Sequence, residues 1–248
     1  MSRRATVLAY HGVGEPPPGE DRHNLFVSRQ EFQRQMDFLA RRRRVVPLSA
    51  VVDGSAGAGS VAITFDDGYR HLLEAAVPVL ERHGFPATVF VPTQYVGRRN
   101  EWDEPSECDL AIMDAAEVRE ADARGLRAES HGHAHLDCRT TDLATVTADL
   151  ATSQDRLEEL VGRRPRLLAW PFRDGSAEAR QEAQRLGFDA AFSIDLPHDG
   201  TFSHERVQVV PQDGAAVFVL KTSGHYMRLR HSAVLDRAYR LVKRVVRP

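Results

Sequence analysis

Residues 61–69 read Val-Ala-Ile-Thr-Phe-Asp-Asp-Gly-Tyr, an apolar run that ends in two adjacent acids and a glycine. A short, continuous apolar run that stops at a turn signal is typical of a buried strand in a parallel sheet. Because side chains alternate between the faces of a strand, Asp66 and Asp67 can serve one site only if the strand ends there and Gly68 lets the backbone turn. An isolated Asp-Asp-Gly is more often a plain turn, and a second feature is therefore needed to support a site.

On both sides of this strand, β-rich runs alternate with helical patterns up to about residue 195. Such alternation is typical of β/α units, and seven strands suit a distorted barrel better than an open sheet. In either arrangement the chemistry lies at the carboxyl ends of the strands. The predicted strands are 6–11, 44–48, 61–66, 87–92, 126–130, 167–171 and 189–194. The predicted helices are 28–44, 70–83 with a restart at Pro78, 114–124, 143–161 and 176–186.

The composition is that of an ordinary soluble globular protein, with 42% hydrophobic and 27% charged residues. The 33 basic and 35 acidic side chains nearly balance, and nothing in that balance points to nucleic acid. A chain of 248 residues fits a single barrel domain, which we place at residues 1–225. The N-terminus lacks the apolar stretch and cleavage site of a signal peptide, and no run is long enough to span a membrane. We therefore expect a cytoplasmic protein.

Residues 226–248 are predicted to form a basic amphipathic helix. Two interpretations stay open: the helix packs on the barrel with its basic face in solvent, or it lies on an anionic membrane and makes the protein peripheral at the inner face. The apolar stripe consists of Val234, Leu235, Ala238, Leu241, Val242, Val245 and Val246, and the cations around it are Arg237, Arg240, Lys243, Arg244 and Arg247.

A histidine cluster, Glu129-Ser-His-Gly-His-Ala-His-Leu-Asp137, directly follows a predicted strand. If the segment is helical, the i and i+4 spacing places His131 and His135 on one face, where their imidazoles could share a divalent ion. If it is extended, all three histidines face the same way, and spacing alone does not exclude His133. A lone histidine is more often structural, but a cluster at a strand end indicates a metal site, and two imidazoles with one carboxylate leave positions open for water and substrate.

These two stretches resemble the first two motifs of the NodB-like polysaccharide deacetylases, carbohydrate esterase family 4. Thr64-Phe-Asp-Asp-Gly68 resembles the first motif, which implies that Asp66 is the catalytic base and Asp67 a metal ligand. The histidine cluster resembles the second motif, which implies that His131 and His135 complete the ligand set. The resemblance extends over about residues 5–195 and implies a distorted (β/α)7 barrel of the NodB-homology type.

The stretch Ala169-Trp-Pro-Phe172 resembles the third motif of the family, which lines the substrate groove. This resemblance implies that Trp170 and Pro171 help to bind substrate and that the backbone N–H of Phe172 helps to hold the oxyanion. Tyr69, which directly follows the first motif, is expected at the substrate as well.

Two features depart from the family pattern. Many members carry an arginine two residues before the proline of the third motif, where it orients the catalytic aspartate, whereas this chain has Ala169, and the nearby Arg173 is not equivalent. The final family motif, a leucine-rich strand ending in a catalytic histidine, has no clear counterpart after residue 195.

We predict that His11 is the general acid, in place of the catalytic histidine of the absent final motif. It stands at the carboxyl end of the first strand, and in a barrel all such ends converge on one face. An imidazole can donate a proton near neutral pH, and Tyr10-His11 resembles a Tyr-His pair that one branch of the family places in the active site. The alternative is that His11 only bonds to the backbone beneath the site.

The resemblance implies a metal-dependent hydrolase of carbohydrate metabolism that cleaves a non-peptide C–N bond, removing the N-acetyl group from an acetylated amino sugar, polysaccharide or glycolipid. Zn²⁺ is the expected ion, with Co²⁺, Ni²⁺ and Mn²⁺ as alternatives; it would bind the acyl oxygen and lower the pKa of water, whose proton Asp66 removes. Two rivals remain: a C–N hydrolase of small cyclic or linear amides on the same fold, and a catalytically silent carbohydrate-binding protein.

Overall fold

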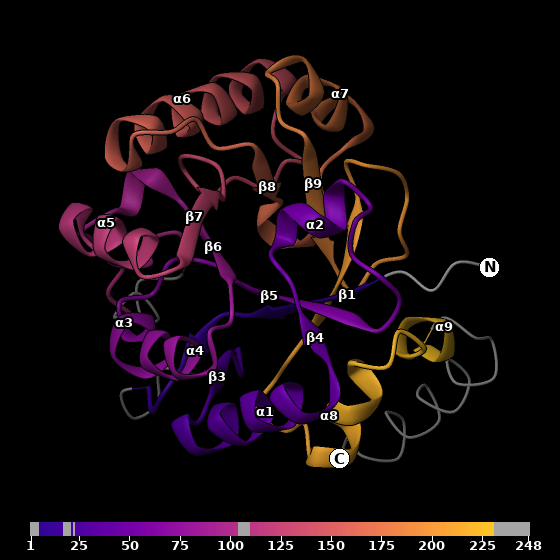
Figure 1. The fold of residues 1–248 in the computed structure, drawn as a ribbon. Helices are drawn as coiled ribbons and strands as arrows, with labels where there is room; N and C mark the ends of the chain where they lie inside the picture. The colour runs from indigo at the N-terminus through magenta and orange to yellow at the C-terminus, as the bar shows by residue number, and fades with distance from the viewer. Residues whose placement is uncertain (1–4, 17–20, 22, 104–109, 231–248) are drawn as a thin grey trace, which may run out of the picture.

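The computed structural model describes residues 5–16, 21, 23–103 and 110–230. Seven parallel strands close into a barrel, because the last strand of the ring pairs back to the first (Figure 1). In ring order they are β1 (Thr6–Tyr10), β10 (His204–Gln208), β9 (Ala190–Ile194), β8 (Leu167–Ala169), β7 (Leu126–Ser130), β6 (Ala87–Val91) and β5 (Ser60–Phe65). The predicted (β/α)7 barrel is therefore confirmed.

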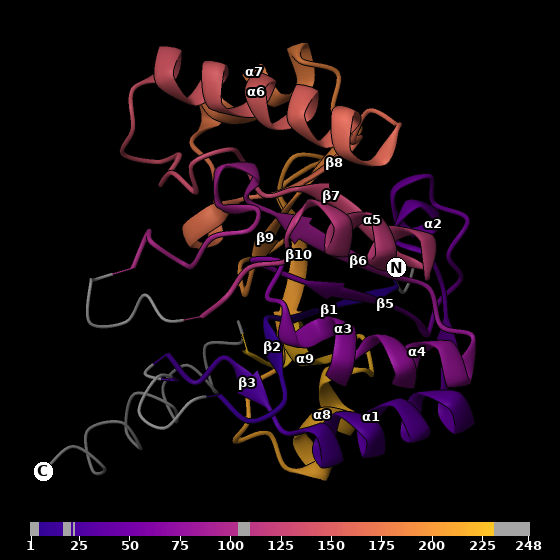
Figure 2. The same ribbon diagram turned by 90° about the vertical axis from the view of Figure 1, so that its left-hand side faces the viewer.

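Helices surround the barrel, with α6 and α7 on one side and α1 and α4 on the opposite side (Figure 2). The helices are α1 (Arg29–Arg42), α2 (Leu48–Val52), α3 (His71–Ala75), α4 (Val77–His83), α5 (Ala115–Ala123), α6 (Leu143–Val161), α7 (Ala177–Arg185), α8 (Ala215–Lys221) and α9 (Tyr226–Arg230). The 3₁₀ turns η1 (Thr93–Tyr95) and η3 (Pro171–Arg173) follow β6 and β8. Within the part of the chain that is described, no helix is both long and apolar enough to cross a membrane.

Two of the predicted helices differ from the described structure or extend beyond it. The predicted helix 70–83 is broken into α3 and α4, and the second piece starts immediately before Pro78. Proline lacks a backbone N–H and is tolerated only in the first turn of a helix, which explains the restart there. The helix predicted for residues 226–248 lies outside the described residues beyond Arg230, and the division into residues 1–225 and 226–248 stays a prediction.

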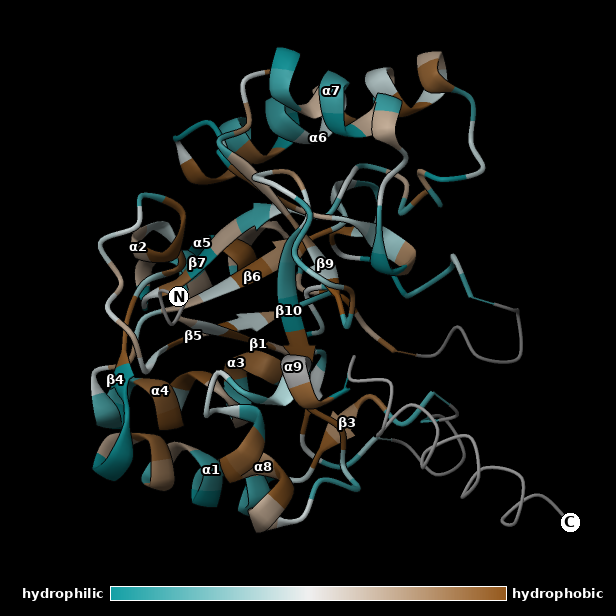
Figure 3. Ribbon diagram, turned by 90° about the vertical axis from the view of Figure 1, so that its right-hand side faces the viewer, coloured by the Kyte–Doolittle hydropathy of each residue, from teal (hydrophilic) through white to brown (hydrophobic). Residues whose placement is uncertain are grey.

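One predicted barrel strand is wrong and another was missed. The segment 44–48 contributes only β4 (Arg44–Val45), which pairs with β5 outside the ring. The seventh strand is instead β10, whose sequence His-Glu-Arg-Val-Gln has no apolar run and is coloured largely hydrophilic in Figure 3. A strand that buries an ion-paired side chain instead of an apolar one gives no hydrophobic signal in the sequence. The short strands β2 (Gly12–Val13) and β3 (Phe26–Val27) pair with each other.

The barrel interior is filled by aliphatic and aromatic side chains that point inward from the strands, and Leu48 of α2 packs with them. A larger apolar cluster lies between the outer face of β1, β5 and β6 and the helices α1, α3 and α4. Along β5, Ala62 belongs to the inner cluster and Val61 and Ile63 to the outer one. Because strand side chains alternate with period two, the same alternation turns Thr64 and then Asp66 toward the barrel axis. The inner cluster contains Val7, Leu48, Ala62, Phe90, Leu167, Ala169, Ala190 and Phe192.

Candidate active site

The register between β1 and β5 places His11 beside Asp66. Tyr10 of β1 pairs with Phe65 of β5. The residues that follow them, His11 and Asp66, therefore lie at the same level at the carboxyl ends of the two strands. The Asp66 N–H donates to the Tyr10 carbonyl at 2.9 Å, and His11 Nε2 lies 3.9 Å from Asp66 Oδ2. Two predicted site residues, 55 positions apart in the sequence, thus meet at the carboxyl ends of neighbouring strands.

A left-handed turn brings the second acid to the same site. Asp67 and Gly68 both have positive φ, 69° and 67°, and the chain reverses directly after β5 ends. This is the turn that the sequence required if both acids were to share one site. A non-glycine residue in this region costs on the order of 1–3 kcal/mol, and such strain persists mainly where the surroundings enforce it.

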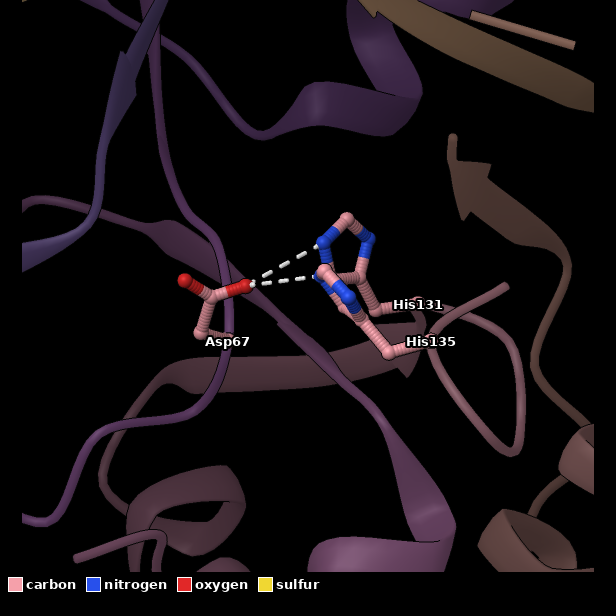
Figure 4. Close-up of side chains that lie close together, drawn as sticks. All are labelled: Asp67, His131 and His135. Carbon is pink, nitrogen blue, oxygen red and sulfur yellow. Dashed lines mark ion pairs between the residues drawn. The ribbon is translucent and has the colours of Figure 1, made fainter. Parts of the chain in front are cut away.

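Asp67, His131 and His135 form the one group of potential metal ligands found among the described residues. Their ligand atoms all lie within 4.8 Å of one another, and all three residues are buried. The Asp67 Oδ1 atom is 3.3 Å from His131 Nε2 and 3.4 Å from His135 Nε2 (Figure 4). Two imidazole nitrogens and one carboxylate oxygen directed at a common point are a donor set that suits a divalent transition metal.

Hydrogen bonding and protonation also fit a metal at this site. His131 Nδ1 lies 2.8 Å from the Ala169 carbonyl, which can only accept, and therefore Nδ1 carries a proton and Nε2 is the nitrogen that faces Asp67. Burial raises the pKa of Asp67, but hydrogen bonds from the two imidazoles outweigh burial and hold that pKa well below its usual value. Burial lowers the pKa of His135, whereas for His131 the bond to Asp67 and the charges of Asp66 and Asp67 outweigh burial and raise the pKa. Metal binds to an ionised carboxylate and to neutral imidazoles, and it would therefore displace the proton that His131 shares with Asp67.

Two aromatic rings pack against the imidazole of His135, one of the three potential metal ligands. The indole of Trp102 stacks on the His135 ring at 4.3 Å between ring centroids, and the Phe172 ring meets it edge-on at 4.9 Å. His135 and Phe172 have φ values of 53° and 50°, again in the left-handed region. Together with Asp67 and Arg173, they are four of the six described non-glycine residues with positive φ, and backbone strain is therefore concentrated at this site.

The middle histidine of the cluster belongs to a different environment. His133 Nδ1 lies 2.8 Å from the Thr93 hydroxyl of η1, and its ring is only partly buried. It is not part of the ligand group formed by Asp67 and its two histidine neighbours. The structure thus separates the three histidines, which spacing alone could not.

The residues expected to contact substrate differ in exposure. Tyr69 and Trp170 are 0% and 1% exposed, and Pro171 is buried as well. Tyr69 packs against Phe26, and Trp170 donates its indole N–H to the Phe202 carbonyl. Both side chains are therefore held by contacts inside the protein. Phe172, at 44%, is the one of these four that presents substantial surface.

A buried arginine, absent from the sequence-based site, binds the predicted base. Arg206 of β10 is 0% exposed and donates Nη1 to Asp66 Oδ1 at 2.6 Å and Nη2 to Asp66 Oδ2 at 2.9 Å. It also donates to the Thr64 hydroxyl at 3.2 Å and lies 5.1 Å from the centre of the Phe90 ring. This two-point contact fixes the plane of the carboxylate as well as its position.

Arg206 also controls the charge of Asp66. Burial raises the pKa of Asp66, but the Arg206 guanidinium, aided by His131 and His11, outweighs burial and holds that pKa below its usual value. Asp66 is therefore ionised at neutral pH, as a base must be. The guanidinium thus orients Asp66 from β10, whereas the family pattern implies an arginine at the position of Ala169 for this purpose.

Two site residues thus escaped the sequence analysis, Arg206 and Trp102. Arg206 lies 140 positions from its partner, in a polar strand with no motif. Trp102 could have been noticed as one of only two tryptophans in the chain, but nothing near it in the sequence indicates contact with His135.

The ion pair between Asp66 and Arg206 leads to a stability prediction. Asp66→Asn or Arg206→Met alone leaves one buried charge uncompensated and should lower the free energy of unfolding by about 3–5 kcal/mol, measured by urea denaturation. The double variant should lose clearly less than the sum of the two single losses. Arg156→Met, which breaks an exposed pair with Glu159, is the control and should cost no more than about 1 kcal/mol. Additive losses at Asp66 and Arg206 would contradict this account.

The polysaccharide deacetylase family model matches residues 53–191, more than half of the chain. YxkH of Bacillus subtilis, whose name places it among the polysaccharide deacetylases, is 22% identical over 222 residues, which cover 86% of this chain and 74% of YxkH. The poly-β-1,6-N-acetyl-D-glucosamine N-deacetylase of Staphylococcus aureus is 24% identical over 69% of this chain and 62% of its own length. The deacetylase PplD of Streptococcus pyogenes, solved in complex with acetate, has the same fold, with a TM-score of 0.75 at 19% identity over 90% of this chain and 99% of PplD. The resemblance seen in the motifs is confirmed, and the chain belongs to the polysaccharide deacetylase family of hydrolases.

Proposed function

We propose that this chain removes the N-acetyl group of an acetylated amino sugar, in a polysaccharide or a glycolipid, by metal-dependent hydrolysis. The observation that carries the proposal is an ionised, arginine-bound Asp66 directly beside the Asp67, His131 and His135 ligand group. A base next to a metal site has no use in a protein that only binds sugar, which argues against the silent alternative. The sugar substrate is supported by the name of the staphylococcal relative.

In this proposal Asp67, His131 and His135 hold the metal, with Zn²⁺ expected and Co²⁺, Ni²⁺ or Mn²⁺ as alternatives. When bound, the ion supplies a Lewis acid that polarises the acetyl carbonyl and makes water more acidic. The Ala169 carbonyl holds the His131 ring in the correct tautomer, and Trp102 limits movement of the His135 ring.

Asp66 accepts a proton from the attacking water through a carboxylate that Arg206 keeps oriented and charged. The backbone N–H of Phe172 donates a hydrogen bond to the acyl oxygen as negative charge develops there. The C–N bond then breaks, and His11 gives a proton to the leaving nitrogen. The products are acetate and a free amine. The proposal that these two groups share the proton transfers is supported by the 3.9 Å distance between His11 Nε2 and Asp66 Oδ2.

Acetate release is the direct test of this function. The purified enzyme is offered acetylated amino-sugar oligomers, an acetylated glycolipid and small cyclic or linear amides, with Asp66→Asn as the inactive control. We expect acetate from one or more of the sugars and a rate lower by about 10²–10⁴-fold in the control. Turnover of the small amides alone would favour the other hydrolase function, and no turnover of any compound would favour a binding protein.

Substitution of single histidines tests the ligand set. His131→Ala and His135→Ala should each lower the metal content after dialysis against buffered Zn²⁺, because each removes one of three protein ligands. His133→Ala is the matched control and should keep nearly the wild-type content. Asp67→Asn should weaken metal binding, whereas Asp66→Asn should retain the metal and lose kcat. Unchanged metal content in the His131 and His135 variants would reject this assignment.

The role of His11 is tested by the leaving group. His11→Ala should retain metal while kcat falls by roughly a hundredfold or more, because the amine must leave without a proton donor. Acetyl esters or anilides with a good leaving group need less protonation and should be affected far less. Equal losses for good and poor leaving groups would mean that His11 only positions the site.

Location is a separate part of the proposal. We infer a cytoplasmic enzyme that contacts an anionic membrane through its basic C-terminal sequence, which would bring it to a glycolipid substrate. Deleting residues 232–248 should then abolish binding to anionic vesicles and leave the melting temperature unchanged. A truncated protein that is insoluble or melts much earlier would mean that this segment packs on the barrel.

A further inference from the structure

A buried carboxylate on α6 accepts hydrogen bonds from the backbone between the two histidine ligands. Asp149 is 7% exposed, and it accepts the backbone N–H of His133 through Oδ2 at 2.8 Å and that of Ala134 through Oδ1 at 2.7 Å. Hydrogen bonds to an ionised acceptor are roughly twice as strong as those between neutral groups. One side chain therefore fixes two consecutive peptide units of the loop that joins His131 to His135.

A second hydrogen-bonded contact on the same face of α6 also holds this loop. Ser153, one helical turn after Asp149, is fully buried, and its hydroxyl lies 2.7 Å from that of Ser130. The Ser130 hydroxyl in turn accepts the N–H of Gly132 at 3.1 Å. Residues four apart share one face of a helix, and α6 thus meets the loop along a continuous polar stripe.

The glycine in this loop is explained by the same carboxylate. A Cβ atom on Gly132 would lie 2.8 Å from Asp149 Oδ2, closer than real Cβ contacts allow, and Gly132 has a φ of 75°. The approach of Asp149 thus leaves no space for a side chain at this position, and the positive φ independently favours glycine.

We infer that Asp149 is a positioning residue for the metal ligands: it holds the loop so that His131 and His135 are aligned before the metal arrives. The inference rests on the proposed metal site. His135 directly follows the two bonded peptide units and is itself in the left-handed region, with a φ of 53°. Without Asp149, two partly buried backbone donors lose their acceptor, and the loop is free to relax away from that conformation.

Metal affinity distinguishes this role from simple docking of α6 on the barrel. A docking residue would affect the thermal stability of the metal-free protein and leave the affinity of the folded protein unchanged. A positioning residue must weaken the metal complex of the protein that remains folded. Both quantities are measured on the full chain: Zn²⁺ affinity by competition with a chromophoric chelator, and the melting temperature of the chelator-treated protein.

Asp149→Asn is the variant of choice, because it keeps the shape of the side chain but turns an amide donor toward one of the two backbone donors. We expect its Kd for Zn²⁺ to rise by about 10–100-fold, the range typical of residues that support metal ligands. Asp155→Asn is the matched control, since Asp155 lies on the same helix, is 65% exposed and pairs with Arg164. Its Kd should stay within about twofold of the wild-type value.

A folded Asp149→Asn protein whose Kd for Zn²⁺ matches that of the wild type would overturn the inference. If this variant does not fold, Asp149→Ser replaces it, and an unchanged Kd there would overturn the inference equally. His131→Ala is measured in parallel to keep the two proposals apart. Wild-type affinity in His131→Ala would reject the metal site itself, whereas loss there with no effect at Asp149 would reject only the positioning role.

Discussion

The catalytic end of this barrel depends on one buried ion pair, Asp66 with Arg206. Removing two charges from water costs several kcal/mol per ion, and only close two-point geometry with additional contacts offsets that cost. Thr64 and the Phe90 ring supply the further contacts to the guanidinium. The pair links β5 to β10 across the barrel interior and keeps Asp66 ionised in a place where burial alone would favour its neutral form.

This pair orients Asp66 without an arginine in the third motif. Ala169, where the family pattern implies that arginine, packs inside the barrel, and its carbonyl orients His131. Backbone strain lies next to these fixed groups, at Asp67 and His135. Stored strain of this kind is consistent with a site shaped in advance for a metal and a reacting substrate.

Much of this architecture could be predicted from the sequence because it depends on local patterns. The alternation of apolar strands and helices indicated the barrel, and a strand that ends in two acids and a glycine placed Asp66 and Asp67. The missed strand was β10, because its inward side chain is Arg206 rather than an apolar residue. No local pattern could pair that arginine with an aspartate 140 positions away, since only the closure of the barrel brings them together. The separation of His133 from the ligand group likewise depends on the path of the loop.

Metal-dependent hydrolysis is tested by comparing acetate release from one acetylated sugar by metal-stripped and by metal-reconstituted protein. The enzyme is stripped with a chelator, desalted, and assayed before and after addition of one equivalent of Zn²⁺, Co²⁺, Ni²⁺ or Mn²⁺. We expect no acetate above background from the stripped protein and recovery with at least one of these ions. Acetate release by the stripped protein at the reconstituted rate would rule out metal-dependent hydrolysis.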